Sequence, residues 1–435
     1  MRFQKRSMGF WVVTIFILGF VSCVAVLFIT RGKAFNRLLF LDSSDTGMDF
    51  FHSIEYVHGR KPYERFNTLY PPLANLFFYI LFRFVPAWQY GTWMPTFEES
   101  IRARGTPIDL RVWQPTMVLF IVFVAVSVIA LLILAQKCVN SKTGIHKDLF
   151  SVSILLGYGV LYSLERGNII IISFLCCLFF MRYKDSKNRL LNALAIVMLA
   201  IGAGLKIYPA LLGIILIYDK QYKKALIAVG LGILSLVLPT LIFHEGLSGI
   251  GMFLNILSSH AEASSFVTDG YSFDRICNTI IQLIASASGR EVGDAGMALS
   301  SFLSKLNLPM TILTLGCGFF MEKRWQKALV CCTAMMLFSF QYPYATIFFL
   351  IPLIMMVAEE GCIRKDNAFM FFTLLFATAW LPVMDVEGWP VSLIYGRFQI
   401  CMVLFVGYIF GRTGRKIPNF CKEVTLKVKA RKSPN

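Results

Sequence analysis

Apolar residues along this chain fall into blocks long enough to cross a lipid bilayer. The first block, Gly9–Thr30, contains no charged residue, and a hydrocarbon core of ~30 Å is crossed by ~20 helical residues. Because lipid offers the backbone no hydrogen-bonding partner, such blocks must be helices. The pattern predicts membrane helices near residues 9–30, 113–136, 149–164, 168–181, 190–205, 207–218, 225–243, 306–321, 328–340, 345–358, 367–382 and 391–410.

Several of these blocks are short for a complete crossing. The pairs 149–164/168–181 and 190–205/207–218 have the lengths expected of broken or kinked helices that line a cavity. The composition agrees with a membrane protein, because 57% of the residues are hydrophobic and 15% are charged, against about a quarter charged in a soluble domain. The predicted fold class is therefore an all-α polytopic membrane protein with about 12 transmembrane helices.

The net charge of +17 is concentrated on one set of connections between these helices. Short loops rich in Lys and Arg remain on the cytoplasmic side of a membrane. The amino terminus and the tail after Gly411 belong to that basic side, so both termini are expected to be cytoplasmic. The opposite short turns, near residues 166, 206, 342 and 386, contain only Arg166 and Lys206 as basic residues. We expect a membrane domain over residues 1–411 and a basic cytoplasmic tail over residues 412–435.

Two outer connections are long, 31–112 and 244–305, and each contains an apolar stretch too short to cross. Leu73–Val85 and Phe273–Ser286 are predicted to be helices that lie at the membrane interface. The eleven cysteines mostly lie within apolar blocks and form no C-x-x-C pair, so they are expected to be buried reduced thiols rather than zinc ligands or disulfides.

Three carboxylates, Asp42, Asp45 and Asp49, follow the first helix. If residues 49–58 are helical, Asp45, Asp49 and His52 share one face. A carboxylate beside an apolar pocket is suited to general-base catalysis, although acidic residues at a helix end are often no more than solvated caps.

The residues that follow carry a resemblance to a known enzyme group. An Asp near the end of the first helix, then "GRKPY" (59–63) and "YPPL" (70–73) before an apolar run, resemble bacterial membrane glycosyltransferases of the GT-C superfamily. The branch resembled most includes the polyprenyl-phosphate-mannose-dependent mannosyltransferases. "ERGNIII" (165–171) and the Lys-x-x-Pro of "GLKIYPALL" (204–212) fit the same resemblance, which covers roughly the first half of the chain.

The cations of the outer turns are candidates for holding a lipid phosphate. An ionisable residue at membrane depth suggests function, although a lysine or arginine that snorkels to the interface is the alternative. We assign phosphate binding to Lys206 and Arg166, with Arg275 as a weaker candidate. The remaining residues expected to line the substrate cavity are Tyr63, Tyr70, Asn168, Tyr208 and His260.

Arg397 lies within the last apolar block and is expected to face the interior of the bundle. There it would form an ion pair with Asp385 or Glu387, or contact a lipid phosphate.

The resemblance implies a transferase at the outer leaflet of the bacterial plasma membrane. The donor would be a polyprenyl-phosphate hexose, the acceptor a hydroxyl of a glycolipid or cell-envelope glycan, and Asp49 the general base, with Asp45 or His52 assisting and the anomeric centre inverted. No cofactor and no nucleic-acid partner are expected, although the Asp42/Asp45/Asp49 group leaves a metal-assisted version open. A transporter or flippase of a lipid-linked sugar, or a polysaccharide polymerase or ligase, is the alternative.

Overall fold

The protein is a bundle of helices capped at one end by shorter helices, as shown by a computed structural model that describes residues 7–38, 46–85, 111, 114–140, 143–262, 266–338 and 341–432. No strand forms among those residues; two isolated bridges pair Ser7 with Cys362 and Gly157 with Ala379. The predicted all-α polytopic class is confirmed, and the chain is a multi-pass membrane protein.

Each predicted membrane segment coincides with one helix or with two consecutive helices. Five helical stretches are long and apolar enough to cross a membrane by themselves. The bundle elements are α1 (Met8–Ile29), α8 (Gln114–Cys138), α9 (Lys147–Leu155), α10 (Tyr158–Arg166), α11 (Ile170–Tyr183), α12 (Arg189–Leu205), η4 (Tyr208–Gly213), α13 (Ile214–Tyr218), α14 (Tyr222–Thr240), α18 (Asn307–Cys317), η5 (Gly318–Phe320), α19 (Arg324–Phe338), η6 (Pro343–Phe349), α20 (Leu350–Glu360), α21 (Ala368–Thr378) and α22 (Leu393–Lys432).

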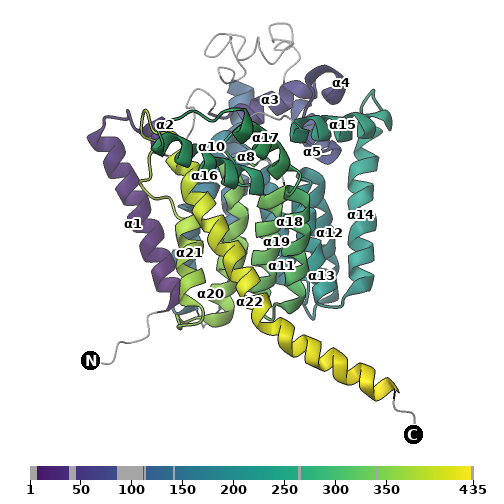
Figure 1. The fold of residues 1–435 in the computed structure, drawn as a ribbon. Coiled ribbons are helices and arrows are strands. Elements are labelled where there is room, and N and C mark those ends of the chain that lie inside the picture. Colours follow the sequence, from purple (N-terminus) through teal and green to yellow (C-terminus); the bar gives the residue numbers. More distant parts are fainter. Residues whose placement is uncertain are drawn as a thin grey trace.

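Short helices gather at the end of the bundle that we call the outer end, following the predicted topology. They are α2 (Phe35–Leu38), α3 (Met48–Tyr56), α4 (Pro62–Phe66), α5 (Pro72–Phe82), α15 (Ser248–Glu262), α16 (Phe273–Ala287) and α17 (Asp294–Ser304). The first turn of α1 and the far end of α22 lie at the opposite, inner end (Figure 1). The two predicted interfacial helices are therefore present as α5 and α16. Helix α22 continues to Lys432, through the predicted boundary between residues 411 and 412.

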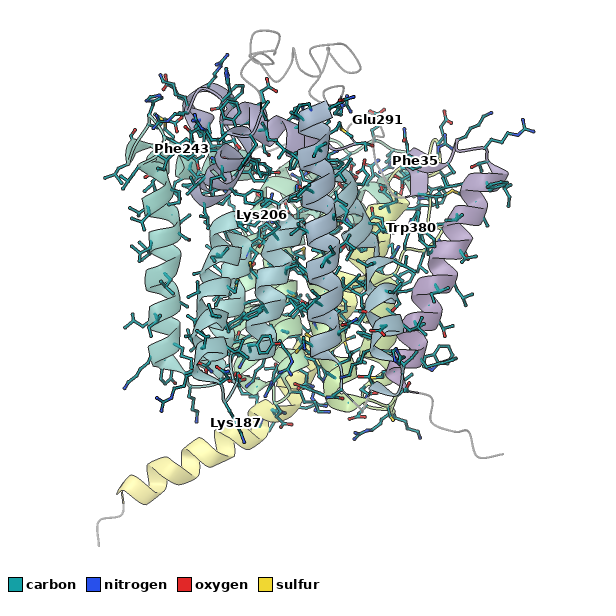
Figure 2. All side chains as sticks on the ribbon, turned by 180° about the vertical axis from the view of Figure 1, so that it is seen from behind. Phe35, Lys187, Lys206, Phe243, Glu291 and Trp380 are labelled. Atoms are coloured by element: carbon teal, nitrogen blue, oxygen red, sulfur yellow. The ribbon has the colours of Figure 1, made fainter. Side chains whose placement is uncertain are left out.

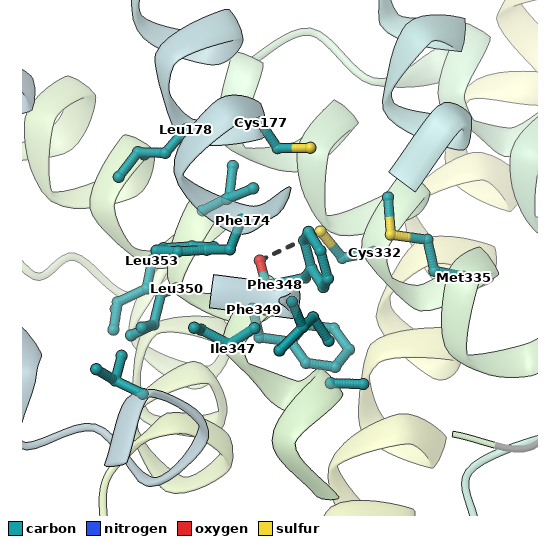
Figure 3. Packing of buried hydrophobic residues seen from close by; sticks show 14 of the residues in the cluster. Phe174, Cys177, Leu178, Cys332, Met335, Ile347, Phe348, Phe349, Leu350 and Leu353 are labelled. Carbon is teal, nitrogen blue, oxygen red and sulfur yellow. Dashed lines mark hydrogen bonds between the residues drawn. The ribbon is translucent and has the colours of Figure 1, made fainter. Parts of the chain in front are cut away.

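The core of the bundle is formed by α11, α19 and the η6–α20 pair, most of whose side chains are buried. Figure 3 shows Phe174 of α11 packed beside Phe348 and Leu353, with the thiol of Cys332 donating to the carbonyl oxygen of Phe348 at 3.4 Å. The described cysteines are free, and most are buried. They act as small apolar side chains, as the sequence predicts.

Charged side chains at the inner end neutralise one another. Lys184 is fully buried and contacts Asp185 at 2.8 Å and Asp219 at 2.5 Å, and Lys327 reaches the other oxygen of Asp219 at 2.6 Å. These pairs join the turns that follow α11 and α13 to the first turn of α19. Because a buried charge without a partner is costly, the network fixes the inner ends of these helices relative to one another.

Arg397 faces the bundle interior as predicted, but the predicted ion pair with Asp385 or Glu387 is wrong. Its guanidinium donates instead to the carbonyl oxygens of Phe376 (2.8 Å from Nε) and Ala379 (2.5 Å from Nη2), at the end of α21. The last carbonyls of a helix have no partner within that helix. Arg397 therefore closes the end of α21, which breaks off inside the bundle, and lies over the Phe398 ring at 4.8 Å.

We expect Arg397→Leu to lower the stability of the fold by about 2–3 kcal/mol, because it leaves buried carbonyls unsatisfied. The control is Arg415→Leu, on an exposed part of the same helix. Thermal unfolding of the purified protein in detergent measures the effect. Equal melting temperatures for the two variants would contradict the assignment.

Candidate active site

Helix α3 carries Asp49 and is attached to the turn between α10 and α11. Its first residue is preceded by Gly47, whose φ of 73° suits glycine. The backbone N–H of Gly47 donates to the carbonyl oxygen of Glu165 at 2.9 Å. One face of α3 is buried through Phe50, whose ring contacts Phe78 of α5 and Phe123 of α8. These contacts place Asp49 in the first turn of α3, beside residues 165–168.

Arg166 and Asn168 hold the two oxygens of the Asp49 carboxylate. Nη2 of Arg166 donates to Oδ1 at 2.7 Å, and Nδ2 of Asn168 donates to Oδ2 at 2.6 Å. Asn168 is fully buried, and its own Oδ1 accepts from the backbone N–H of Ile170 at 2.9 Å. Asn168 thus caps the start of α11 while it binds Asp49, so its orientation is fixed from both sides.

This pairing sets the charge of Asp49. Burial alone would raise the pKa of the carboxyl group, but the Arg166 charge, the hydrogen bonds from Arg166 and Asn168 and the nearby Lys206 together lower it below its usual value. Asp49 is therefore ionised at neutral pH. The side chains of Asp49 and Arg166 are only 16% and 17% exposed, so bulk water screens the pair weakly.

Lys206 brings a second cation toward the same carboxylate. It follows the last residue of α12 in an extended conformation, before the turn into η4. Its Nζ lies 4.2 Å from the centre of the Tyr70 ring, and its charge acts on Asp49. Within the described part of the chain, Lys206 makes no hydrogen bond or ion pair. Figure 2 shows it within the bundle, far above Lys187 at the inner end.

Tyr70 contacts both Asn168 and Lys206 and connects them to the outer layer. Its hydroxyl lies 3.3 Å from Nδ2 of Asn168, while its ring contacts Lys206. Its carbonyl oxygen accepts from the hydroxyl of Tyr63 at 3.0 Å and from Nδ2 of Asn75 at 3.3 Å. The two prolines that follow Tyr70 start α5 without N–H groups that need partners. Tyr70 is therefore fixed at both its backbone and its ring.

The two long outer connections meet at this layer. The carboxylate of Glu245 accepts from the backbone N–H groups of Tyr63 at 2.9 Å and Glu64 at 2.7 Å, which caps α4. The N–H of His244 donates to the carbonyl oxygen of Arg60 at 2.9 Å. Residues 242–245 thus hold the segment that leads to Tyr70.

A model of glycosyltransferase family 87 matches residues 68–339. The chain belongs to this family of GT-C-like membrane glycosyltransferases. Comparison with curated proteins and with solved structures finds no match. The family match includes Tyr70, Arg166, Asn168 and Lys206, whereas Asp49 lies before its first residue.

For this family 87 member, the structure brings together five of the residues singled out from the sequence: Asp49, Arg166, Asn168, Lys206 and Tyr70. His52 lies one turn further along α3, is 7% exposed, and its ring stacks on Tyr56 at 6.1 Å. The Tyr208 ring packs against Phe348 at 5.8 Å, and Tyr63 supports Tyr70 from behind.

Other predicted residues lie elsewhere or cannot be placed. Arg275 is on α16, where it lies 3.8 Å from Asp274 and acts on Asp269. Within the described part of the chain, Arg275 and Lys206 make no hydrogen bond or ion pair with a common partner. Asp42 and Asp45 lie outside the described residues, as does the side chain of His260. No group of three or more His, Cys, Asp or Glu suited to a metal ion exists within the described ranges.

Sequence reasoning missed Tyr344, whose hydroxyl is close enough to interact electrostatically with Asp49, Tyr70 and Tyr208. A signal was available, because Tyr-Pro occurs at 70–71, 208–209 and 342–343. Each dipeptide lies at the start of a helix, α5, η4 or η6. Proline suits the first turn of a helix, so the repeated pair marks three helix starts. Tyr70, in the first pair, and Tyr344, directly after the third, both interact electrostatically with Asp49.

We expect Gly167→Ala to displace α3 from the Arg166 turn. Gly167 has φ 63°, and an added Cβ would lie 2.6 Å from Cβ of Phe50. Left-handed strain and overpacking together cost about 2–4 kcal/mol. Thermal unfolding and transferase activity should both fall, whereas Gly230→Ala, whose Cβ would meet no atom within 4 Å, should lower neither. A Gly167→Ala protein that melts and turns over like the wild type would contradict this account.

Proposed function

We propose that this glycosyltransferase moves a hexose from a polyprenyl-phosphate donor to a hydroxyl of a glycolipid or cell-envelope glycan at the outer leaflet. The observation that carries the proposal is the placement of one carboxylate, Asp49, between two cations, Arg166 and Lys206, at the outer end of the bundle. This reaction needs one group that removes a proton from the acceptor and cations that bind the donor phosphate. Mannose is the sugar suggested by the resemblance to polyprenyl-phosphate-mannose-dependent enzymes.

Lys206 is the principal phosphate ligand in this proposal. Its ammonium has three donors and makes no hydrogen bond to a described residue, and the Tyr70 ring holds it in place. Arg166 places a second, permanently positive charge at the same site. Two fixed cations stabilise the negative charge that develops on the departing lipid phosphate.

Asp49 is the general base. The pair with Arg166 lowers the proton affinity of Asp49, so the carboxylate is a weak base while that pair is intact. A donor phosphate that shares the Arg166 guanidinium would weaken its hold on Asp49 and raise the basicity of the carboxylate once the donor has bound. The activated acceptor oxygen attacks the anomeric carbon opposite the leaving phosphate, which inverts that centre. His52, on the next turn of α3, is a candidate to assist.

The proposed setting is the bacterial plasma membrane, with both termini in the cytoplasm and the Asp49 site on the outer face. The basic residues at the inner end and the shared position of α1's start and α22's end support this orientation. Membership in a glycosyltransferase family favours transfer over the flippase alternative.

We expect Asp49→Asn to reduce transfer by at least about 100-fold, the usual loss when a general base is removed. The assay incubates purified protein with a panel of polyprenyl-phosphate sugars and octyl mono- and disaccharides as acceptors, and quantifies released polyprenyl phosphate. Glu64→Gln is the control, because Glu64 is exposed at the outer end and its side chain forms an ion pair with Lys61. Full activity of Asp49→Asn would refute the base assignment.

Lys206→Ala should raise the donor KM by about 10-fold or more, the effect of losing one charge-assisted hydrogen bond. The control is Lys223→Ala, which removes an exposed lysine from the first turn of α14. Initial rates at varied donor concentration separate KM from kcat. A donor KM equal to that of the wild type would remove Lys206 from the phosphate site.

A further inference from the structure

A second group of polar side chains lies at the outer end, away from Lys206. It consists of Asp269, Asp385, Arg275 and Tyr395. Asp269 interacts electrostatically with Asp385 and with Arg275, and both carboxylates act on Tyr395. Asp269 and Asp385 are partly exposed, whereas Tyr395 is 3% exposed. The mechanism proposed above uses none of these four residues.

The backbone around Asp269 is held by side chains from two helices. Nε2 of Gln399, on α22, donates to the carbonyl oxygens of Thr268 at 2.8 Å and Gly270 at 3.0 Å. From α16, Nδ2 of Asn278 donates to the carbonyl oxygen of Val267 at 3.0 Å. Gln399 and Asn278 are 4% and 1% exposed. Buried amides that fix a loop backbone make Asp269 a preorganised acceptor of hydrogen bonds.

Asp385 is held equally firmly. Its oxygens accept from the hydroxyl of Ser392, at 2.9 and 3.1 Å, and from the backbone N–H of Ile394 at 3.2 Å, at the start of α22. These bonds leave further lone pairs on the carboxylate.

Two further groups of this region have hydrogen-bonding capacity that no described residue satisfies. The hydroxyl of Tyr271 has no partner although the residue is fully buried, and its ring lies 5.6 Å from that of Tyr395. Nη1 of Arg275 is likewise buried without a partner. Buried polar groups without partners are rare in folded proteins and indicate a missing ligand or water.

A row of tyrosines connects this group to Asp49. Tyr395 interacts electrostatically with Tyr162 and Tyr342. The rings of Tyr162 and Tyr342 lie 5.8 and 5.5 Å from that of Tyr344, which in turn interacts with Asp49. The row thus leads from the second carboxylate pair to the proposed base.

We propose that Asp269, Asp385 and Tyr395 form a subsite that binds the saccharide hydroxyls of the acceptor, with the tyrosine row directing the reacting hydroxyl to Asp49. The inference rests on the proposed function. Carboxylates accept hydrogen bonds from sugar hydroxyls, Arg275 can donate to sugar oxygens, and aromatic rings pack against the C–H faces of a sugar ring. The positive charge of Arg275 disfavours a divalent cation between the two carboxylates.

The subsite and the Lys206 contact with Tyr70 are built from different elements. The donor side is built from α5 and α12, and the second group from α16, α22 and the segment between α21 and α22. Donor and acceptor would then reach Asp49 from different elements, so a change in one subsite should leave the affinity of the other nearly unchanged.

The test uses the purified full chain in lipid nanodiscs, the polyprenyl-phosphate sugar from the panel that releases the most polyprenyl phosphate, and octyl mono- and disaccharides of mannose, glucose and galactose as acceptors. Asp269→Asn should raise the KM of the best octyl disaccharide about 10-fold while the donor KM changes less than twofold. Tyr395→Phe should raise the same KM, and serves if Asp269→Asn does not fold. Asp294→Asn, an exposed charge change on neighbouring α17, should change neither KM.

The outcomes are distinguishable. If the wild type releases no polyprenyl phosphate from any donor, the proposed function fails and the inference fails with it. If release occurs but none of the octyl glycosides is glycosylated, or if the acceptor KM of both Asp269→Asn and Tyr395→Phe equals that of the wild type, the saccharide subsite alone is overturned.

Discussion

The hydrogen bonds from Arg166 and Asn168 to Asp49 determine the arrangement of the outer end. They join a helix of the outer layer, α3, to the turn where two bundle helices meet, so the carboxylate is fixed from two independent directions. Gly47 adds a backbone bond to Glu165, and Gly167 permits Phe50 to approach the turn closely. If this attachment were lost, the Asp49 carboxylate would no longer be held by the turn between α10 and α11.

The pair with Arg166 also explains how Asp49 can act as the proposed base although its pKa is lowered. The folded state favours the ionised carboxylate because Arg166 is paired with it, so the stabilisation is present above the ordinary pKa of an aspartate and is lost as the pH falls through the lowered value. At neutral pH Asp49 is therefore always charged. Its basicity depends on how strongly the Arg166 guanidinium binds its carboxylate. In the proposed mechanism, a donor phosphate that competes for the Arg166 guanidinium would weaken this pairing and so couple donor binding to proton removal.

Much of this architecture was predictable because lipid imposes simple rules on sequence. Apolar length located the membrane helices and the short outer helices α5 and α16. Asp49, Arg166 and Lys206 could be singled out because charged residues are rare in such a chain. Arg397 was misjudged because hydropathy cannot reveal that α21 ends inside the bundle, where carbonyl oxygens rather than carboxylates need a partner. The contacts of Arg275 with Asp274 and Asp269 could not be predicted, because no local pattern shows which distant segments approach α16.

The charge of a lysine is compensated differently at the two ends of the bundle, and this difference supports the ligand proposed for Lys206. Lys184 at the inner end lies between two carboxylates, each within 2.8 Å, so its charge is fully compensated by the protein. Lys206 has an aromatic ring beneath it and the Asp49 charge near it, but no carboxylate in hydrogen-bonding contact within the described residues. An ammonium held in partial burial without such a contact raises the free energy of the ligand-free protein. An anion bound to Lys206 would remove this cost, so the uncompensated charge favours the phosphate-binding role proposed for this residue.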